Sequence, residues 1–352
     1  MTTVTDENKE ISKDVRELAC SIFNCEHLAA AQKAAEEAFN NASDEDRRKA
    51  LEDKNLKKEN LKKLVRKAEK KHPCAGFSLI QLVEWHRTND SQDAQKVHTS
   101  QDWHNPEPFN GDIETAEILV VSMNPAYNFK DRDDDNLDEE LKYPQPARGE
   151  INPESPEAHA MAGYFTDRFF NPTYISGGAK GKKRSPSPFP RYIYKTINFV
   201  FGDEPEEKPS PEEIAEYLTR RHVASTELFH CKSSTFTNCR TKQEEALDQC
   251  GAHLQEILNQ AKNLKLVILL GVSSIRLVFD IEGTITSEDE VRKGNGEIGV
   301  FLREKGFTVG KNIALLPGHG QAQAGVKGIL QQRTSGKPGF RVYLSGFGRL
   351  FQ

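Results

Sequence analysis

The stretch QEEALDQCGAHLQEILNQAKNLKLVILLG, residues 243–271, decides the fold class. In its first part, apolar side chains recur at intervals of three and four residues, which is the spacing of one face of an amphipathic helix. These side chains are Leu247, Cys250, Leu254, Ile257, Ala261 and Leu264. Its last part, LKLVILLG (264–271), is a continuous apolar run. Such a run is typical of a strand that is covered on both faces.

Three further apolar runs accompany this stretch. They are EILVVS (117–122), HVASTELFHC (222–231) and NIALLPG (312–318). The run at 222, the helix and the run at 264 follow one another within about 50 residues, which is the length of a parallel crossover unit. We therefore predict an α/β fold whose core is a small sandwich of helices on a sheet.

The chain has 352 residues and changes in character along its length. Residues 1–105 are predicted to form a helical, charged N-terminal region. Residues 106–352 are predicted to form the α/β domain, with a long insertion at about 131–215. The segment DKNLKKENLKKLVRKAEKKH (53–72) is strongly basic with a thin apolar stripe. It is either a solvated helix face or an arm that contacts phosphates or a partner.

Composition restricts the possible partners. The formal net charge is −5 and 29% of the residues are charged, with a mean hydropathy of −0.68. Binding to nucleic acid would therefore require a local basic patch. The sequence has no apolar stretch long enough to span a bilayer and no signal-peptide pattern at its start. We expect a cytoplasmic protein with no membrane partner.

Six cysteines occur in the chain, and no two of them form a C-x-x-C pair; they stand at positions 20, 25, 74, 231, 239 and 250. Structural zinc and iron–sulfur sites normally show closer pairing, so buried or surface thiols in a reducing compartment are the favoured interpretation. Four histidines between 72 and 104 match no ligand spacing. We predict no metal and no cofactor.

Polar residues follow two of the predicted strands directly. Asn124 and Pro125 follow EILVVS, and His319 lies among glycines in PGHGQ (317–321). In parallel α/β sheets, ligands bind beyond the carboxyl ends of the strands, so these residues mark a candidate site. The alternatives are a plain strand-to-loop turn at Asn124 and a structural turn histidine at 319. The common phosphate-binding glycine motifs and the G-x-S-x-G motif are absent from the sequence.

The motifs SMNPA (122–126), LGVSS (270–274) and PGHG (317–320) occur in the order and at the strand ends seen in the uracil-DNA glycosylase superfamily, which the chain resembles. TELFHCKS (226–233), with the helix after it, is similar in spacing to the thermophilic-type branch. The likeness covers about 110–130 and 220–325. It implies a three-layer α/β/α sandwich with a short, mostly parallel four-stranded sheet. It also implies a monofunctional glycosylase that flips a base out of DNA, excises it and leaves an abasic site.

The resemblance implies two catalytic residues. Asn124 would orient the attacking water or bind the base, since its amide both donates and accepts hydrogen bonds. His319 would donate a hydrogen bond to the base oxygen on which negative charge develops. No lysine lies in the first motif, so a lyase that works through a Schiff base is not indicated.

Other residues are candidates for contact with the DNA backbone. Ser273 and Ser274 either contact phosphates or only cap a helix. Gln321 or the neighbouring glycine amides would take a phosphate, because GHGQA replaces the H-P-S pattern of the superfamily. The segment GGAKGKKRSPSPFPRYIYK (177–195) reads as a loop and is either a flexible insertion or a DNA-facing surface. Its basic cluster consists of Lys182, Lys183 and Arg184.

Departures from the superfamily pattern bear on the substrate. Ala126 stands where the uracil-specific branch has a tyrosine that blocks groups on C5 of the pyrimidine, and Tyr127 comes one position later. Glu227 stands where the thermophilic-type branch has an asparagine that reads the base. A carboxylate only accepts hydrogen bonds, which suits the N4 amino group of cytosine. Alternatively, Glu227 faces solvent at the edge of the sheet.

Together these departures predict excision of a 5-substituted cytosine, with glucosylated hydroxymethylcytosine as the leading example. The pattern is similar to that of prokaryotic anti-phage DNA glycosylases. Two alternatives remain at this point. One is a repair glycosylase of the uracil or thymine type, and the other is a non-catalytic DNA-binding module on the same fold.

Overall fold

The computed structural model describes residues 11–52, 59–89, 103, 106–123, 151–168, 188–201, 208–231, 243–270 and 312–316. Its helices are α1 (Lys13–Phe23), α2 (Glu26–Asn40), α3 (Asp44–Glu52), α4 (Glu59–Glu69), α5 (Ala75–Asn89), α6 (Pro156–Asp167), α8 (Pro188–Phe201), α9 (Pro211–Arg220) and α10 (Gln243–Gln260). Its strands are β1 (Ile118–Ser122), β2 (Val223–Glu227), β3 (Leu266–Leu270) and β4 (Asn312–Leu316). Among the helices of these ranges, none has both the length and the apolar character needed to cross a bilayer.

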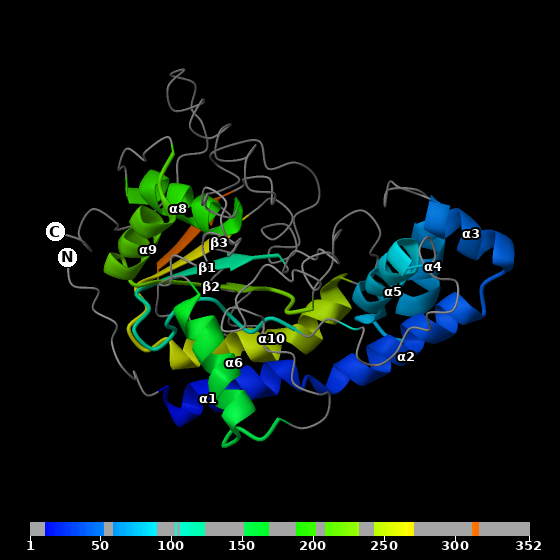
Figure 1. Cartoon of the computed structure of the whole chain (residues 1–352), viewed down its shortest axis with the longest axis horizontal. Coiled ribbons are helices and arrows are strands. Elements are labelled where there is room, and N and C mark those ends of the chain that lie inside the picture. The colour runs from blue at the N-terminus through cyan, green and yellow to red at the C-terminus, as the bar shows by residue number, and fades with distance from the viewer. Residues whose placement is uncertain are drawn as a thin grey trace.

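The strands form one parallel sheet at the centre of Figure 1, in the order β2-β1-β3-β4. Ile118 lies opposite both Val223 and Leu266, and Leu266 lies opposite Asn312. The strands therefore start level with one another, and their carboxyl ends share one edge of the sheet. The predicted α/β class and the short parallel sheet are confirmed.

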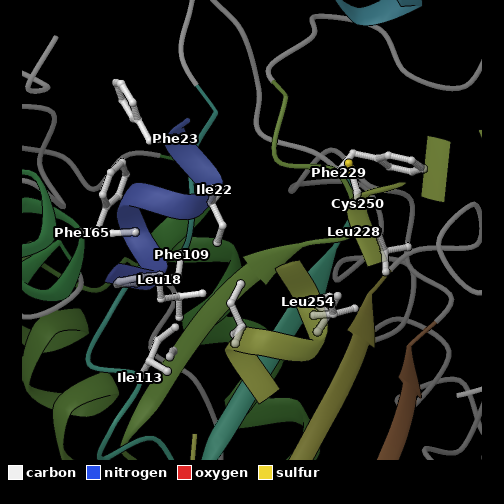
Figure 2. Packing of buried hydrophobic residues seen from close by; sticks show 14 of the residues in the cluster. Leu18, Ile22, Phe23, Phe109, Ile113, Phe165, Leu228, Phe229, Cys250 and Leu254 are labelled. Atoms are coloured by element: carbon white, nitrogen blue, oxygen red, sulfur yellow. The ribbon is translucent and has the colours of Figure 1, made fainter. Parts of the chain in front are cut away.

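The two faces of the sheet are buried against different helices, because successive side chains of a strand point to opposite faces. Ile118 and Val120 belong to a core with buried side chains of α8 and α9. Leu119 and Val121 belong to the larger core, to which α1, α6 and α10 contribute. Figure 2 shows part of this larger core, with side chains from α1 and α10 near the sheet. Double-sided burial explains why β1 and β3 read as continuous apolar runs.

The predicted helix and strand boundaries shift inward by a few residues. Helix α10 buries Leu247, Leu254 and Ile257, as predicted, but ends at Gln260. Strand β2 ends at Glu227, within the predicted run 222–231. Its backbone nevertheless continues to pair with the chain after β1, as described for the candidate site below.

The N-terminal helices fall into two groups. Helix α1 packs against α6 and α10 and contributes Leu18 and Ile22 to the large core. Helices α2 to α5 pack on one another around a core of their own and lie at one end of the molecule in Figure 1. The predicted boundary at residue 105 stays a prediction. Contact between α1 and the α/β layers nevertheless ties the first helix to that part of the chain.

Helix α4 covers most of the basic segment 53–72. Its stripe of Leu61, Leu64 and Val65 is fully buried in the core of α2 to α5. On its outer side, the Nζ atom of Lys63 lies 3.1 Å from a carboxylate oxygen of Asp46. The described part of this segment is thus a helix with a buried apolar stripe and an exposed, ion-paired outer side, and its contact with phosphates or a partner stays a prediction.

The predicted loop at 177–195 is wrong for its second half, because α8 begins at Pro188. A proline is tolerated in the first turn of a helix, where the backbone N–H has no partner within the helix. Behind it, Tyr192, Ile193 and Ile197 are buried on the sheet side of α8. This apolar face makes the segment helical despite its prolines. Residues 177–187 lie outside the described residues.

Candidate functional site

Of the predicted site residues, Glu227 falls within the described ranges. The others lie outside the described residues; they are Asn124, Ala126, Tyr127, Lys182, Lys183, Arg184, Ser273, Ser274, His319 and Gln321. Within the described residues, the candidate site consists of Glu227 and the strands that lead to the other residues.

Glu227 is the last residue of β2 and is 2% exposed. The alternative that it faces solvent at a sheet edge is wrong. It lies opposite Ser122, the last residue of β1. Because side chains alternate along a strand, Glu227 shares the face of Val223, which packs with α8 and α9. Burying a carboxylate is costly, so a position like this is favoured where the group has a specific partner or task.

Backbone pairing continues past the ends of the two strands. The N–H of Leu228 donates to the carbonyl of Ser122 at 2.8 Å, and the N–H of Phe229 donates to the carbonyl of Met123 at 3.0 Å. Met123 directly precedes Asn124 in the chain. The chain that leaves β1 is therefore hydrogen-bonded to the segment after β2 as far as Met123, the residue before Asn124.

The outer edge of β2 is covered by the segment that precedes β1. The backbones of Asn110 and Ser225 exchange two hydrogen bonds, at 2.7 and 2.8 Å, in an antiparallel bridge. The hydroxyl of Thr226 donates to the carbonyl of Pro108 at 2.9 Å. This cover satisfies polar groups that an edge strand would otherwise expose and encloses the end of β2.

A polar network fixes this cover to α6. The guanidinium of Arg168 donates to a carboxylate oxygen of Glu107 at 3.0 Å and to the side-chain oxygen of Asn110 at 2.9 Å. It also lies 5.5 Å from the centre of the Tyr164 ring. Glu107 and Asn110 are buried. Sequence reasoning missed this network, because residues 58 and 61 positions apart carry no spacing signal.

Four cysteine thiols lie near one another beside the segment that follows β2. They are Cys25 between α1 and α2, Cys74 before α5, Cys231 after β2, and Cys250 in α10. The Cys250 thiol is hydrogen-bonded to Cys74 and is within electrostatic range of Cys231 and Cys25. This contact with Cys74, and then burial, raises the pKa of Cys250 well above its ordinary value. The sequence predicts buried or surface thiols, and its spacing carries no signal that these four lie near one another.

The cysteines of the described residues are thiols and not disulfides. Within the same residues, no three His, Cys, Asp or Glu side chains are arranged to hold a metal ion. The four thiols are therefore close together without forming a ready-made site for a single ion. Cys239 lies outside the described residues.

Two neighbouring imidazoles, the buried His230 and the partly buried His253, lie close in sequence to Cys231 and Cys250. His230, next to Cys231 in the chain, is 2% exposed, and its Nδ1 atom lies 2.8 Å from the carbonyl oxygen of Glu107. Burial, and secondarily His253, lowers the pKa of His230 to about 3. The two imidazole rings are 5.8 Å apart, edge to face. His230 is thus neutral at pH 7, with Nδ1 as the donor to the carbonyl.

Comparison with known proteins gives no relative: no family model matches the chain, and no curated protein or solved structure matches it. Function is therefore inferred from the residues, their burial and their position on the sheet.

Proposed function

We propose that the protein is a monofunctional DNA glycosylase, an N-glycosyl hydrolase that flips a modified pyrimidine out of DNA and excises it. The proposal rests mainly on the parallel pairing of β1 with β2. This pairing puts the buried carboxylate of Glu227 level with Ser122, two residues before Asn124. The buried carboxylate of Glu227 thus lies at the end of β2, and Asn124 follows the neighbouring strand β1, which ends at the same edge of the sheet.

The arrangement of all the strands supports the same site. Because β3 and β4 are parallel to β1, the segments GVSS (271–274) and PGHGQ (317–321) also follow strands that end at this edge. We propose that the complete fold is the three-layer α/β/α sandwich of the uracil-DNA glycosylase superfamily, with Asn124 and His319 as its catalytic pair.

In the proposed reaction, the bond between C1′ of the sugar and the base breaks while water adds to C1′. Positive charge develops on the sugar and negative charge on the departing base. Asn124 orients the water or the base through its side-chain amide, which does not titrate. His319 donates a hydrogen bond to the base oxygen that gains charge. The products are the base with its proton and an abasic site.

The proposed substrate is a 5-substituted cytosine, such as glucosylated hydroxymethylcytosine. The carboxylate of Glu227 only accepts hydrogen bonds, so it suits the N4 amino donor of cytosine and repels the O4 acceptor of uracil. Ala126 in place of a tyrosine leaves room at C5. Such bases protect phage DNA, so the proposed biological role is anti-phage defence.

Ser273, Ser274 and Gln321 are the proposed contacts to the DNA backbone at this edge. The basic cluster Lys182, Lys183 and Arg184 is proposed to contact phosphates nearby. Its position before α8 is in keeping with this role, because α8 covers the sheet face that Glu227 shares.

The experiment offers the protein three duplexes that differ in one base: unmodified cytosine, uracil, and glucosylated hydroxymethylcytosine. Alkali-labile abasic sites are then quantified on a denaturing gel. We expect cleavage of the modified duplex alone. Cleavage of the uracil duplex alone would assign the chain to ordinary repair. Tight binding with no abasic product would make it a DNA-binding module.

A further inference from the structure

The segment that precedes β1 is hydrogen-bonded to the end of β2 at two places. The backbones of Asn110 and Ser225 exchange two hydrogen bonds, at 2.7 and 2.8 Å. The N–H of Glu107 donates to the carbonyl of His230 at 3.0 Å, and Nδ1 of His230 lies 2.8 Å from the carbonyl oxygen of Glu107. Glu227 lies between Ser225 and His230 in the chain, so the chain is held on either side of it.

The end of β2 is also held from its other side, by the residues that end and follow β1. The N–H groups of Leu228 and Phe229 donate to the carbonyls of Ser122 and Met123, at 2.8 and 3.0 Å. The end of β2 thus runs between the chain that leaves β1 and residues 107–110, which we call the cover segment. Because both neighbours are hydrogen-bonded to it, the cover segment helps to fix the position of the last side chain of β2.

Arg168, at the end of α6, holds both ends of the cover segment. One nitrogen of its guanidinium donates to a carboxylate oxygen of Glu107 at 3.0 Å and to the side-chain oxygen of Asn110 at 2.9 Å. Both acceptor side chains are buried, and the hydrogen bond to Glu107 joins two charged groups, which makes it stronger than a neutral one. The guanidinium also lies 5.5 Å from the centre of the Tyr164 ring, which restricts its own position.

Other contacts already attach the cover segment to α6. The rings of Phe109 and Phe165, both labelled in Figure 2, are 6.1 Å apart, and the N–H of Gly111 donates to the carbonyl of Phe165 at 2.8 Å. A buried polar network adds direction to such packing, because each of its hydrogen bonds requires a particular geometry. The Arg168 network therefore has a use beyond attachment: it fixes the cover segment in one position against β2.

We propose that Arg168 is a positioning residue for base recognition. By holding Glu107 and Asn110, it keeps the end of β2 in place, and with it the Glu227 carboxylate that accepts from the N4 amino group of the base. This role rests on the proposed glycosylase function. It requires no contact between Arg168 and DNA, so replacing Arg168 should slow excision without weakening the affinity for DNA.

The first test is hydrogen exchange of the backbone amides of Leu228 and Phe229, with the amides of β3 as an internal reference. We expect both amides to exchange about 10-fold faster relative to β3 in Arg168→Met, because a lost hydrogen bond to a charged group lowers local stability by a factor of this order. Arg168→Lys keeps a charged donor and should lie between Arg168→Met and the unaltered protein. Unchanged relative exchange in Arg168→Met would overturn the proposal, whether or not the chain excises a base.

The second test is excision of glucosylated hydroxymethylcytosine in a single turnover at saturating protein, together with the affinity for the same duplex. We expect Arg168→Met to lower the rate by about 10- to 100-fold, the usual effect of a misplaced recognition group, and to leave the affinity within about twofold. Arg168→Lys should restore part of the rate. Arg16→Met is the control for lost stability, because the Arg16 side chain is 8% exposed and donates to the carbonyls of Ile11 and Pro153. It should change neither the rate nor the relative exchange at Leu228.

The outcomes separate this proposal from the proposed function. If the unaltered protein releases no base while exchange at Leu228 and Phe229 rises in Arg168→Met, the positioning of the end of β2 is supported and the glycosylase function fails. If excision occurs and Arg168→Met slows it no more than Arg16→Met does, the positioning role is overturned. A weaker affinity for DNA at an unchanged saturating rate would make Arg168 a phosphate contact and would overturn it as well.

Discussion

At the scale of single residues, burial separates the informative carboxylates from the ordinary ones. Several acidic side chains lie at the surface in weak ion pairs, such as those of α3 and α4. Glu227 and Glu107 are instead buried beside the end of β2. Glu107 is held by Arg168, which explains its position structurally. Glu227 stands at the end of a strand that leads toward the predicted site.

Replacing Glu227 by glutamine tests the role of its carboxylate in base recognition. The amide keeps the shape but presents a donor as well as an acceptor to the base. We expect the single-turnover excision of glucosylated hydroxymethylcytosine to slow by about 10- to 100-fold, since a mismatched hydrogen bond costs about 1–3 kcal/mol. Glu117→Gln is the control, because Glu117 lies at the opposite end of β1 and pairs with Lys265. Equal rates for both variants would remove Glu227 from the site.

Replacing Arg168 by methionine tests the buried network. Glu107 would lose a charged partner at 3.0 Å. Because the Arg168 side chain is 30% exposed, we expect a loss of about 2 kcal/mol in the free energy of unfolding, less than for a fully buried pair. Urea denaturation measures it. Lys13→Met, which removes only exposed pairs, should change stability by less than about 0.5 kcal/mol. If both variants lose the same free energy of unfolding, the buried network stabilises the fold no more than an exposed ion pair does.

At the scale of elements, local signals in the sequence set where the helices start. Ser210 caps the start of α9. Its hydroxyl accepts from the backbone N–H of Glu213 at 3.2 Å, and the Glu213 carboxylate accepts from the N–H of Ser210 at 2.6 Å. This reciprocal capping box satisfies backbone N–H donors at the start of the helix that have no partner within the helix.

Replacing Ser210 by alanine should lower the free energy of unfolding by about 1 kcal/mol, the usual effect of losing a helix cap. Ser210→Asp keeps an acceptor at the cap and should stay near the original stability. Thermal or urea unfolding followed by circular dichroism measures both variants. If the Ser210→Ala variant is as stable as the unaltered protein, the capping box does not stabilise α9.

The elements that sequence could predict are those with a clear period. The sequence predicts the helix within 243–264 from the regular spacing of its apolar positions, and the strands at 117, 264 and 312 from their continuous apolar runs. The helical start at Pro188 was missed, since prolines and basic residues outweighed the apolar face behind them. The meeting of Cys25, Cys74, Cys231 and Cys250 was missed because tertiary packing alone brings these segments together.

At the scale of the whole molecule, the net charge of −5 means that DNA would have to bind to local basic patches. The basic segment of α4 is an inadequate candidate, because its lysines pair with carboxylates: Lys62 with Glu59, and Lys63 and Lys67 with Asp46. The cluster Lys182, Lys183 and Arg184 before α8 stays the predicted phosphate contact.

Replacing Lys182, Lys183 and Arg184 together by alanine should reduce the slope of log affinity against log salt by about 2 to 3, as expected for three lost phosphate contacts. Fluorescence anisotropy at several salt concentrations measures it. The matched control removes the same charge by replacing Lys62, Lys63 and Lys67. If the control lowers the slope and the cluster variant does not, the basic helix and not the cluster contacts the DNA.

The central claim is that a base is cut from DNA at the carboxyl edge of this sheet. The most direct measurement is mass spectrometry of the base released from DNA that contains glucosylated hydroxymethylcytosine. We expect the intact substituted cytosine and an equal amount of abasic DNA. The rate should fall by about 100-fold or more in Asn124→Ala and in His319→Ala, if each supplies about 3 kcal/mol at the transition state. Release at an unchanged rate by both variants, or no release by the unaltered protein, would contradict the claim.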